Sequence, residues 1–263
     1  MIIVLAKKEK TSEKLPLENQ IVTLSKIKKI FKDSKAAKKI LKQSDYDLDI
    51  LEGINIDFSD EISVPIKVEK LRFLVNIELL SEPIEVIAEK IITEMPKAIR
   101  SLNRVAKMEL KALSKIKNAM KEDEVVEEIF EDAGHHLDTL DGINIDFSDE
   151  IDVSAKTINS RILLNKKLLD ESFDIMMRYA VHELVHALQH MESEDAIESY
   201  MAYDKEEYLD RPDEIEAFQR QNQYDANQRG EEEVVAYVED LVDYHDIPPD
   251  EQEDKKEELL EKV

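Results

Sequence analysis

The chain has 263 residues, 42% hydrophobic and 37% charged, which is enough to bury one large core or two smaller ones. It contains no cysteine, so disulfides and thiolate metal sites are excluded. The net charge of −25 is unevenly spread: residues 1–44 carry 12 lysines against 4 acids, and residues 191–263 carry 26 acids against 7 bases. Because the acidic C-terminal third repels phosphate, nucleic acid is not an expected partner.

No apolar stretch approaches the ~20 residues that a membrane-spanning helix needs, so no membrane partner is expected. The apolar stretch 1–6 is much shorter, and positive charge follows it rather than precedes it, unlike a secretory signal. A short strand or a docked tail is expected there instead. We therefore expect a cytoplasmic protein, or one inside a viral particle assembled in a cytoplasm.

The first half of the chain predicts a helix, a strand and a further helical stretch. Residues 17–43 have large apolar residues at helical spacing with lysines between them, which predicts one helix. The decapeptide GINIDFSDEI at 53–62 alternates Ile, Ile and Phe with polar residues and predicts a half-buried strand. Residues 97–132 are charged and helical in pattern.

The same decapeptide recurs at 142–151, an offset of 89 residues. An ungapped comparison of 24–99 with 113–188 gives 30 identical residues in 76 positions. This match predicts a tandem duplication of a helix–strand–strand–helix unit. In the second copy the expected elements are a helix, two strands and a second helix, at about 113–131, 142–148, 157–165 and 173–192.

The last helix of the second copy contains the sequence HELVH. His182 and His186 are four residues apart, so they lie one turn apart on one helix face, where both imidazoles can bind one Zn²⁺. Glu183 is then placed to take a proton from a metal-bound water. The first copy has Thr93-Glu94-Met95-Pro96-Lys97 at these positions, and residues 1–134 contain no histidine. The first copy therefore cannot form this site, and its proline is expected to kink or restart the helix.

Two further helices are expected after the HELVH helix. One begins near Pro212, with acids in its first turn, and another covers about 231–245 after Gly230. Two prolines after Ile247 end the second helix, and residues 250–263 are expected to be a short exposed helix or disordered.

A catalytic zinc usually has three protein ligands and a water, so two histidines leave one ligand missing. His190 is about 6 Å further along the helix axis at 1.5 Å per residue, which suits a residue that supports the ligands rather than a ligand. His245 is isolated in the sequence. The acids near 213–216 are the better source of the third ligand.

The order of two strands, the segment Arg161-Ile162-Leu163-Leu164-Asn165, Leu168-Leu169 and a HELVH helix resembles the small zincin metallopeptidases. It is similar to ImmA/IrrE-like and SprT-like domains and to phage-encoded metallopeptidases. In the ImmA/IrrE-like and related gluzincin families, the third ligand is a Glu on a later helix, followed three positions on by a small residue. Glu214-Ile215-Glu216-Ala217 is similar to that pattern, so the resemblance implies Glu214 as the third ligand, with Glu216 as the alternative.

The resemblance and the internal repeat together predict an α+β fold with two zincin-like units and a helical C-terminal part. Residues 1–112 would be a degenerate repeat without metal ligands, 113–248 the metallopeptidase domain and 249–263 an acidic tail. The implied activity is zinc-dependent hydrolysis of peptide bonds in a protein or peptide substrate. Zn²⁺ would bind His182, His186 and Glu214, with Glu183 as general base.

Other residues and a second function stay open. Tyr237, Tyr244 and His245 are candidate oxyanion donors, whereas His135 and His136 are expected in an exposed loop. The alternative function is a non-enzymatic binding or assembly protein, such as a viral component, built on the same fold. The histidine-free first repeat favours that alternative and could bind a protein partner. The retention of Glu183 beside both histidines favours an enzyme, because a purely structural zinc does not need it.

Overall fold

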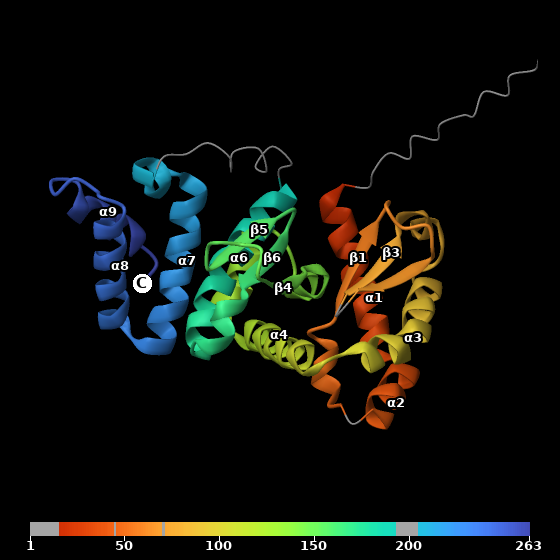
Figure 1. The fold of residues 1–263 in the computed structure, drawn as a ribbon. Helices are drawn as coiled ribbons and strands as arrows, with labels where there is room; N and C mark the ends of the chain where they lie inside the picture. Colours follow the sequence, from red (N-terminus) through yellow and green to blue (C-terminus); the bar gives the residue numbers. More distant parts are fainter. Residues whose placement is uncertain (1–15, 45, 70–71, 193–204) are drawn as a thin grey trace, which may run out of the picture.

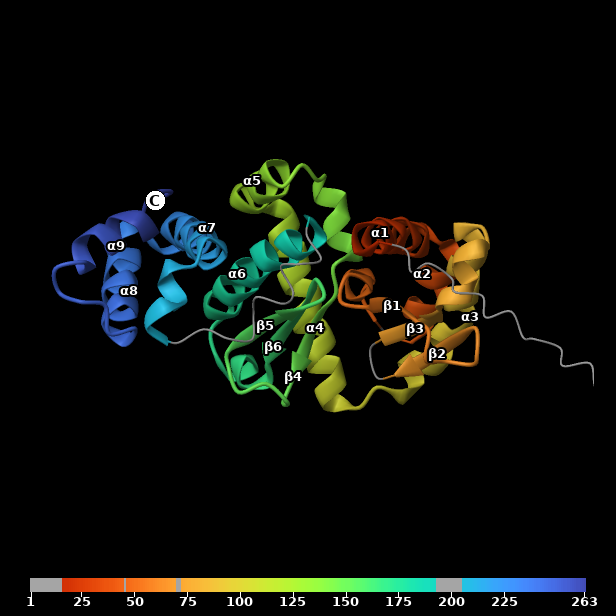
Figure 2. The same ribbon diagram turned by 90° about the horizontal axis from the view of Figure 1, so that it is seen from above.

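The computed structural model describes residues 16–44, 46–69, 72–192 and 205–263, so the expected element at 1–6 lies outside the described residues. The fold is α+β, with many helices and two small three-stranded sheets. Figure 1 and Figure 2 show three neighbouring parts in sequence order: the first sheet with its helices, the second sheet with its helices, and a C-terminal group of helices. In the described residues no helix is both long and apolar enough to cross a membrane.

The first part contains three helices and three strands. They are α1 (Leu17–Asp33), α2 (Lys35–Gln43), β1 (Asn55–Ser59), β2 (Ile66–Glu69), β3 (Arg72–Asn76) and α3 (Ile84–Ser101). The prediction of one helix over 17–43 is wrong, because the chain breaks at Ser34. This residue is extended, and its hydroxyl accepts hydrogen bonds from the backbone N–H groups of Ala36 and Ala37, which caps α2. Helix α3 does not restart at Pro96 but continues through it.

The second part repeats this arrangement. Its elements are α4 (Arg104–Glu122), α5 (Glu124–Asp132), β4 (Ile145–Ser148), β5 (Ala155–Ile158), β6 (Arg161–Asn165) and α6 (Phe173–Glu192). Asp123, 89 residues after Ser34, caps α5 through its carboxylate, so the predicted continuous helix at 113–131 is also broken. The strand predicted at 157–165 is a hairpin instead. Asn159 and Ser160 have φ of 51° and 57°, the left-handed conformation of a two-residue hairpin turn.

The two sheets share one topology, and each has three strands rather than the predicted two. Their strand orders are β1-β3-β2 and β4-β6-β5, with the first pair parallel and the second antiparallel. The registers also correspond, because Ile56 pairs with Phe73 and, 89 residues later, Ile145 pairs with Ile162. Sequence repeat and backbone topology therefore coincide. We call residues 24–99 the first repeat and residues 113–188 the second repeat.

Each sheet packs on its own hydrophobic core, and α4 contributes to both. Leu110 lies in the core of the first repeat, whereas Leu113, Ile116 and Met120 lie in the core of the second. The boundary expected between residues 112 and 113 thus falls within a helix.

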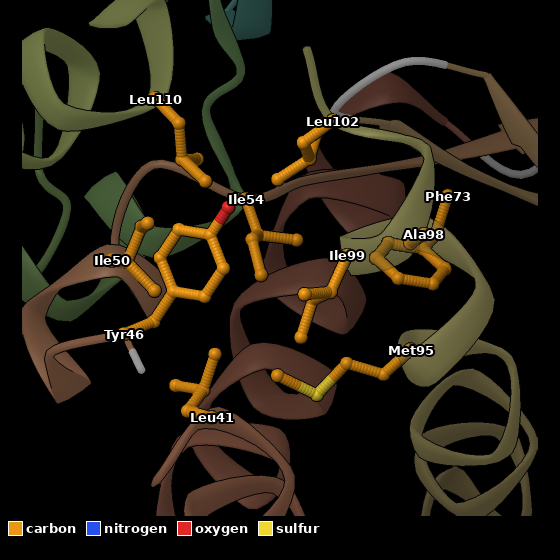
Figure 3. A pocket seen from close by; sticks show the side chains of 10 residues that line it. All are labelled: Leu41, Tyr46, Ile50, Ile54, Phe73, Met95, Ala98, Ile99, Leu102 and Leu110. Carbon is orange, nitrogen blue, oxygen red and sulfur yellow. The ribbon is translucent and has the colours of Figure 1, made fainter. Parts of the chain in front are cut away.

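A small pocket in the first core is lined by apolar and aromatic side chains (Figure 3). The hydroxyl of Tyr46 makes no hydrogen bond to the described residues. None of the lining side chains is a His, Asp or Glu.

The C-terminal part consists of α7 (Pro212–Arg229), α8 (Glu231–Tyr244) and α9 (Gln252–Leu259). Pro212 begins α7 and Gly230 separates α7 from α8, as predicted. The short helix expected in the tail is confirmed as α9, but this helix is not wholly exposed. Leu259 is fully buried, and its carbonyl accepts a hydrogen bond from the Asn222 side chain at 2.9 Å. Helix α9 therefore packs against α7, the helix that faces α6.

Candidate metal centre

Helix α6 has two buried faces, one packed in a hydrophobic core and one directed toward α7. One face carries apolar residues such as Val181 and Leu184 into the core of the second repeat. The other carries His182 and His186, both buried, toward the first turn of α7. Glu214 lies in that turn and is only 1% exposed. The packing of α6 against α7 thus brings residues 28 positions apart into one cluster.

The three side chains converge on one point. Oε2 of Glu214 lies 3.2 Å from Nε2 of His182 and 3.3 Å from Nε2 of His186, and the two Nε2 atoms are 3.2 Å apart. A tetrahedral zinc with ligand bonds of about 2.0–2.1 Å holds neighbouring ligand atoms about 3.3 Å apart. The donor set and its spacing therefore fit a Zn²⁺ ion. In the described parts of the chain no other group of three His, Asp or Glu side chains converges in this way.

The residues considered as alternative ligands lie elsewhere. Glu216 is exposed and accepts a hydrogen bond from Nε2 of Gln189 at 2.8 Å, so it does not join the cluster. His190 is buried one turn beyond His186 and is not part of the group. Ala217, the small residue expected after the third ligand, is fully buried in the second core together with residues of α6.

Two side chains that the sequence did not point out hold the ligands in place. Oε1 of Gln189 lies 2.9 Å from Nδ1 of His186, and Nε2 of Gln189 donates to the carbonyl of Asp213 at the start of α7. A proton on Nδ1 leaves the Nε2 lone pair free for a metal. Nη1 of Arg211 lies 3.5 Å from Oε1 of Glu214, the oxygen that faces away from the histidines. Each oxygen of Glu214 therefore has a defined partner.

The protonation of the cluster follows from its burial and its pairing. Burial lowers the pKa of His186, but the hydrogen bond and charge of Glu214 outweigh burial and raise the pKa to about 9. Burial also acts to raise the pKa of Glu214, but the hydrogen bonds from His182 and His186 hold it well below its ordinary value. Without a metal, the cluster therefore holds a proton on His186 at neutral pH.

Glu183 lies at the edge of a cleft of about 720 Å³ that also contains the three ligands. Its side chain is buried, and its Oε2 has no hydrogen-bond partner in the described residues. One wall of the cleft is formed by residues 152–156, which lead into β5, the edge strand of the second sheet. The opposite wall comes from α8. Glu183 thus lines the same cleft as His182, His186 and Glu214.

The hairpin of β5 and β6 fixes the backbone of α6 next to the site. Oγ1 of Thr157 donates to the carbonyl of Glu183 at 2.9 Å, and Oγ of Ser160 donates to the carbonyl of Ala187 at 2.7 Å. In the first repeat, Val68 and Leu71 occupy the corresponding positions in the sequence. This change from apolar to hydroxyl residues between the two repeats was the one feature of the sequence that could have indicated that the hairpin supports the site.

The three candidate oxyanion donors all line the cleft but differ in surroundings. Tyr244 is 66% exposed, and His245 is buried and stacked on Tyr208. Tyr237 is half-buried below the guanidinium of Arg178, 4.3 Å from its ring centre.

The histidines expected in a loop lie outside the cleft. His135 and His136 follow α5 and are half-buried and exposed, respectively, as expected for loop residues. In the first repeat, Glu94 pairs with Lys97 on the surface of α3 at 3.7 Å. The positions of Glu183 and His186 in the second repeat are thus occupied by a surface ion pair in the first.

Comparisons with protein-family models, with curated proteins and with solved structures found no match to this chain. The function is therefore argued from the geometry of the site.

Proposed function

We propose that the chain is a zinc-dependent metallopeptidase whose catalytic unit is a zincin-like fold formed by the second repeat and α7. The convergence of His182 Nε2, His186 Nε2 and Glu214 Oε2 carries this proposal. Two nitrogens and one carboxylate oxygen leave a fourth position of a tetrahedral ion open, which is the arrangement of catalytic rather than structural zinc. The first repeat would then be a degenerate zincin-like unit from the same duplication.

The roles of the residues follow from their positions. Bound zinc would supply a water of lowered pKa and would polarise the scissile carbonyl. Glu183 would take the proton of this water and deliver it to the leaving amine, a role that suits its Oε2, which has no hydrogen-bond partner among the described residues. Gln189 and Arg211 would orient His186 and Glu214.

The substrate is proposed to be an extended peptide segment of a protein. The outer edge of β5 borders the cleft, and a peptide can add to such an edge as a further strand. Tyr237 is the proposed donor to the developing oxyanion, because Arg178 holds its ring at the cleft wall.

The first test is the metal content of the protein purified without chelators, measured by inductively coupled plasma mass spectrometry. We expect about one zinc per chain for a single site of this kind. His186→Ala should lose the zinc and Glu214→Ala should bind it more weakly, whereas Glu216→Ala should retain it. No zinc after reconstitution with zinc salt, or equal zinc in all variants, would contradict the site.

The second test separates the enzyme from the non-enzymatic binding protein, which the histidine-free first repeat favours. Cleavage of a denatured protein or a peptide library is compared between the wild type and Glu183→Gln at equal zinc content. Loss of cleavage in the variant supports Glu183 as the base. If neither protein cleaves any member of the library, the binding function, with a partner on the first repeat, takes precedence.

A further inference from the structure

The two copies of the decapeptide pack against each other through reciprocal hydrogen bonds. Nδ2 of Asn55 donates to the carbonyl of Ile145 at 2.7 Å and to Oδ1 of Asp146 at 2.8 Å. Asn144, 89 residues after Asn55, donates to the carbonyl of Ile56 at 2.9 Å and to Oδ1 of Asp57. The acceptors of Asn144 are therefore the equivalents, 89 residues earlier, of the acceptors of Asn55. This is the contact pattern of a two-fold axis between the repeats.

The close approach of helix and turn follows the same exchange. A Cβ atom on Gly53 would lie 2.6 Å from the carbonyl oxygen of Leu110, and one on Gly142 would lie 2.1 Å from that of Ile21. Ile21 and Leu110 are themselves 89 residues apart. Glycine is therefore needed at both positions for the same reason: any side chain would collide with the helix backbone of the other half.

Two lysines near the same axis each form one ion pair within their own repeat and one with the other repeat. Lys32 pairs with Glu52 at 3.0 Å and with Asp141 at 2.6 Å. Lys121, its equivalent, pairs with the same two carboxylates at 2.5 and 2.7 Å. Each lysine thus bridges one acid of its own repeat and one acid of the other, so that the charges alternate. These charges are largely withdrawn from solvent.

The residues of this interface are more alike than the rest of the repeats. Nine of the twelve equivalent pairs at the hydrogen bonds, ion pairs and close contacts of this interface are identical, against 30 in 76 over the whole alignment. The identical pairs are Ser25/Ser114, Lys28/Lys117, Lys32/Lys121, Asp49/Asp138, Gly53/Gly142, Asn55/Asn144, Ile56/Ile145, Asp57/Asp146 and Arg72/Arg161, and the others are Ile21/Leu110, Lys29/Asn118 and Glu52/Asp141. A second copy of the second repeat would therefore present nearly the same side chains to this interface as the first repeat does.

We infer that the interface of the second repeat is a self-complementary docking surface whose fitting partner is a second copy of that repeat. In the intact chain the first repeat occupies the partner's place. This inference does not depend on zinc binding or on peptidase activity.

The test begins with the complete chain carrying a protease site between Leu102 and Asn103, in the connection between α3 and α4. The chain is cut, unfolded in urea and refolded, so that both fragments are free to choose partners. Native mass spectrometry then identifies the pairs. We expect the original pair of 1–102 with 103–263 and, in addition, a homodimer of 103–263.

A matched pair of charge reversals makes the result specific. Lys121→Glu should abolish the homodimer, because it replaces the lysine that pairs with Asp141 by an acid in both copies. Lys167→Glu, an exposed change in the 3₁₀ turn after β6, should leave it intact. A fragment 103–263 that is found only with 1–102 or as a monomer overturns the inference, as does a homodimer that survives Lys121→Glu.

Discussion

The carboxylate of Glu214 divides its two oxygens between the histidines and Arg211. His186 is held from its other ring nitrogen by Gln189, which is also tied to the start of α7. These partners fix the direction in which each ligand atom points before any metal arrives. Metal affinity should therefore depend on residues that never touch the ion.

Gln189→Leu should lower zinc affinity about 10- to 100-fold, since supporting partners of metal-bound histidines have effects of that size. The expected result is a right-shifted competition curve against a fluorescent zinc chelator, with unchanged circular dichroism. Gln228→Leu, an exposed change on α7, serves as the control. Equal affinity in wild type and Gln189→Leu would mean that His186 needs no support from Gln189.

Zinc binding should release a proton at neutral pH. The pKa of His186 is raised to about 9 in the metal-free cluster, so below that pH the proton must leave before Nε2 can bind a metal. Apparent affinity should fall as pH decreases from 9 toward 6, by up to about tenfold per unit. Calorimetric titrations at pH 7 in buffers of different ionisation enthalpy measure the released protons. A heat that is independent of the buffer would contradict this protonation state.

Sequence reasoning reached part of this site. Residues four apart in a helix lie on the same face, so the proximity of His182 and His186 could be predicted from the sequence alone. Glu214 was chosen through a resemblance, because the distance between residues on α6 and α7 is set by tertiary packing. Gln189 and Arg211 were missed for the same reason. A glutamine or an arginine near a motif cannot be given a role until the atoms that it contacts are known.

At the scale of elements, hydrophobic periodicity predicted whether a segment is a helix or a strand better than it predicted where that element ends. The apolar stripe continues across Ser34 and Asp123 because the helices on either side of each break face the same core. The breaks come from capping side chains, a local signal that periodicity does not register. The turn at Asn159 and Ser160, by contrast, does interrupt the alternation, because residues 159–161 are all polar, and the prediction of a single strand passed over this turn signal.

The β5–β6 hairpin is expected to set the stability of the helix that carries both histidines. Thr157→Val keeps the shape of the side chain but removes the hydrogen bond to the carbonyl of Glu183. Loss of such a bond costs about 0.5–1.5 kcal/mol. Urea unfolding measures the free energy of unfolding. Thr157→Ser, which retains the hydroxyl, should lie closer to the wild type, and a Val variant as stable as the wild type would show that the bond contributes nothing.

For the whole molecule, the sequence repeat predicted the duplicated topology but not how the two repeats face each other. The decapeptide was identified as a strand, and its Asn55 and Asn144 were expected on a polar face. They are instead buried between the repeats. An identical segment in two otherwise divergent copies indicates a shared constraint. Only the packing identifies this constraint as contact of each copy with the other.

The position of α4 links the behaviour of the two halves. Because this one helix is part of both hydrophobic cores, neither core can melt without exposing apolar surface of the other. A zinc ion bound only to the second half should therefore slow hydrogen exchange of core amides in the first half as well, by lowering the population of the globally open chain. Protection confined to the second half would contradict this cooperativity. If protection extends to both halves, zinc binding is coupled to the folding of the first half. The stability of the half without histidines would then contribute to zinc affinity.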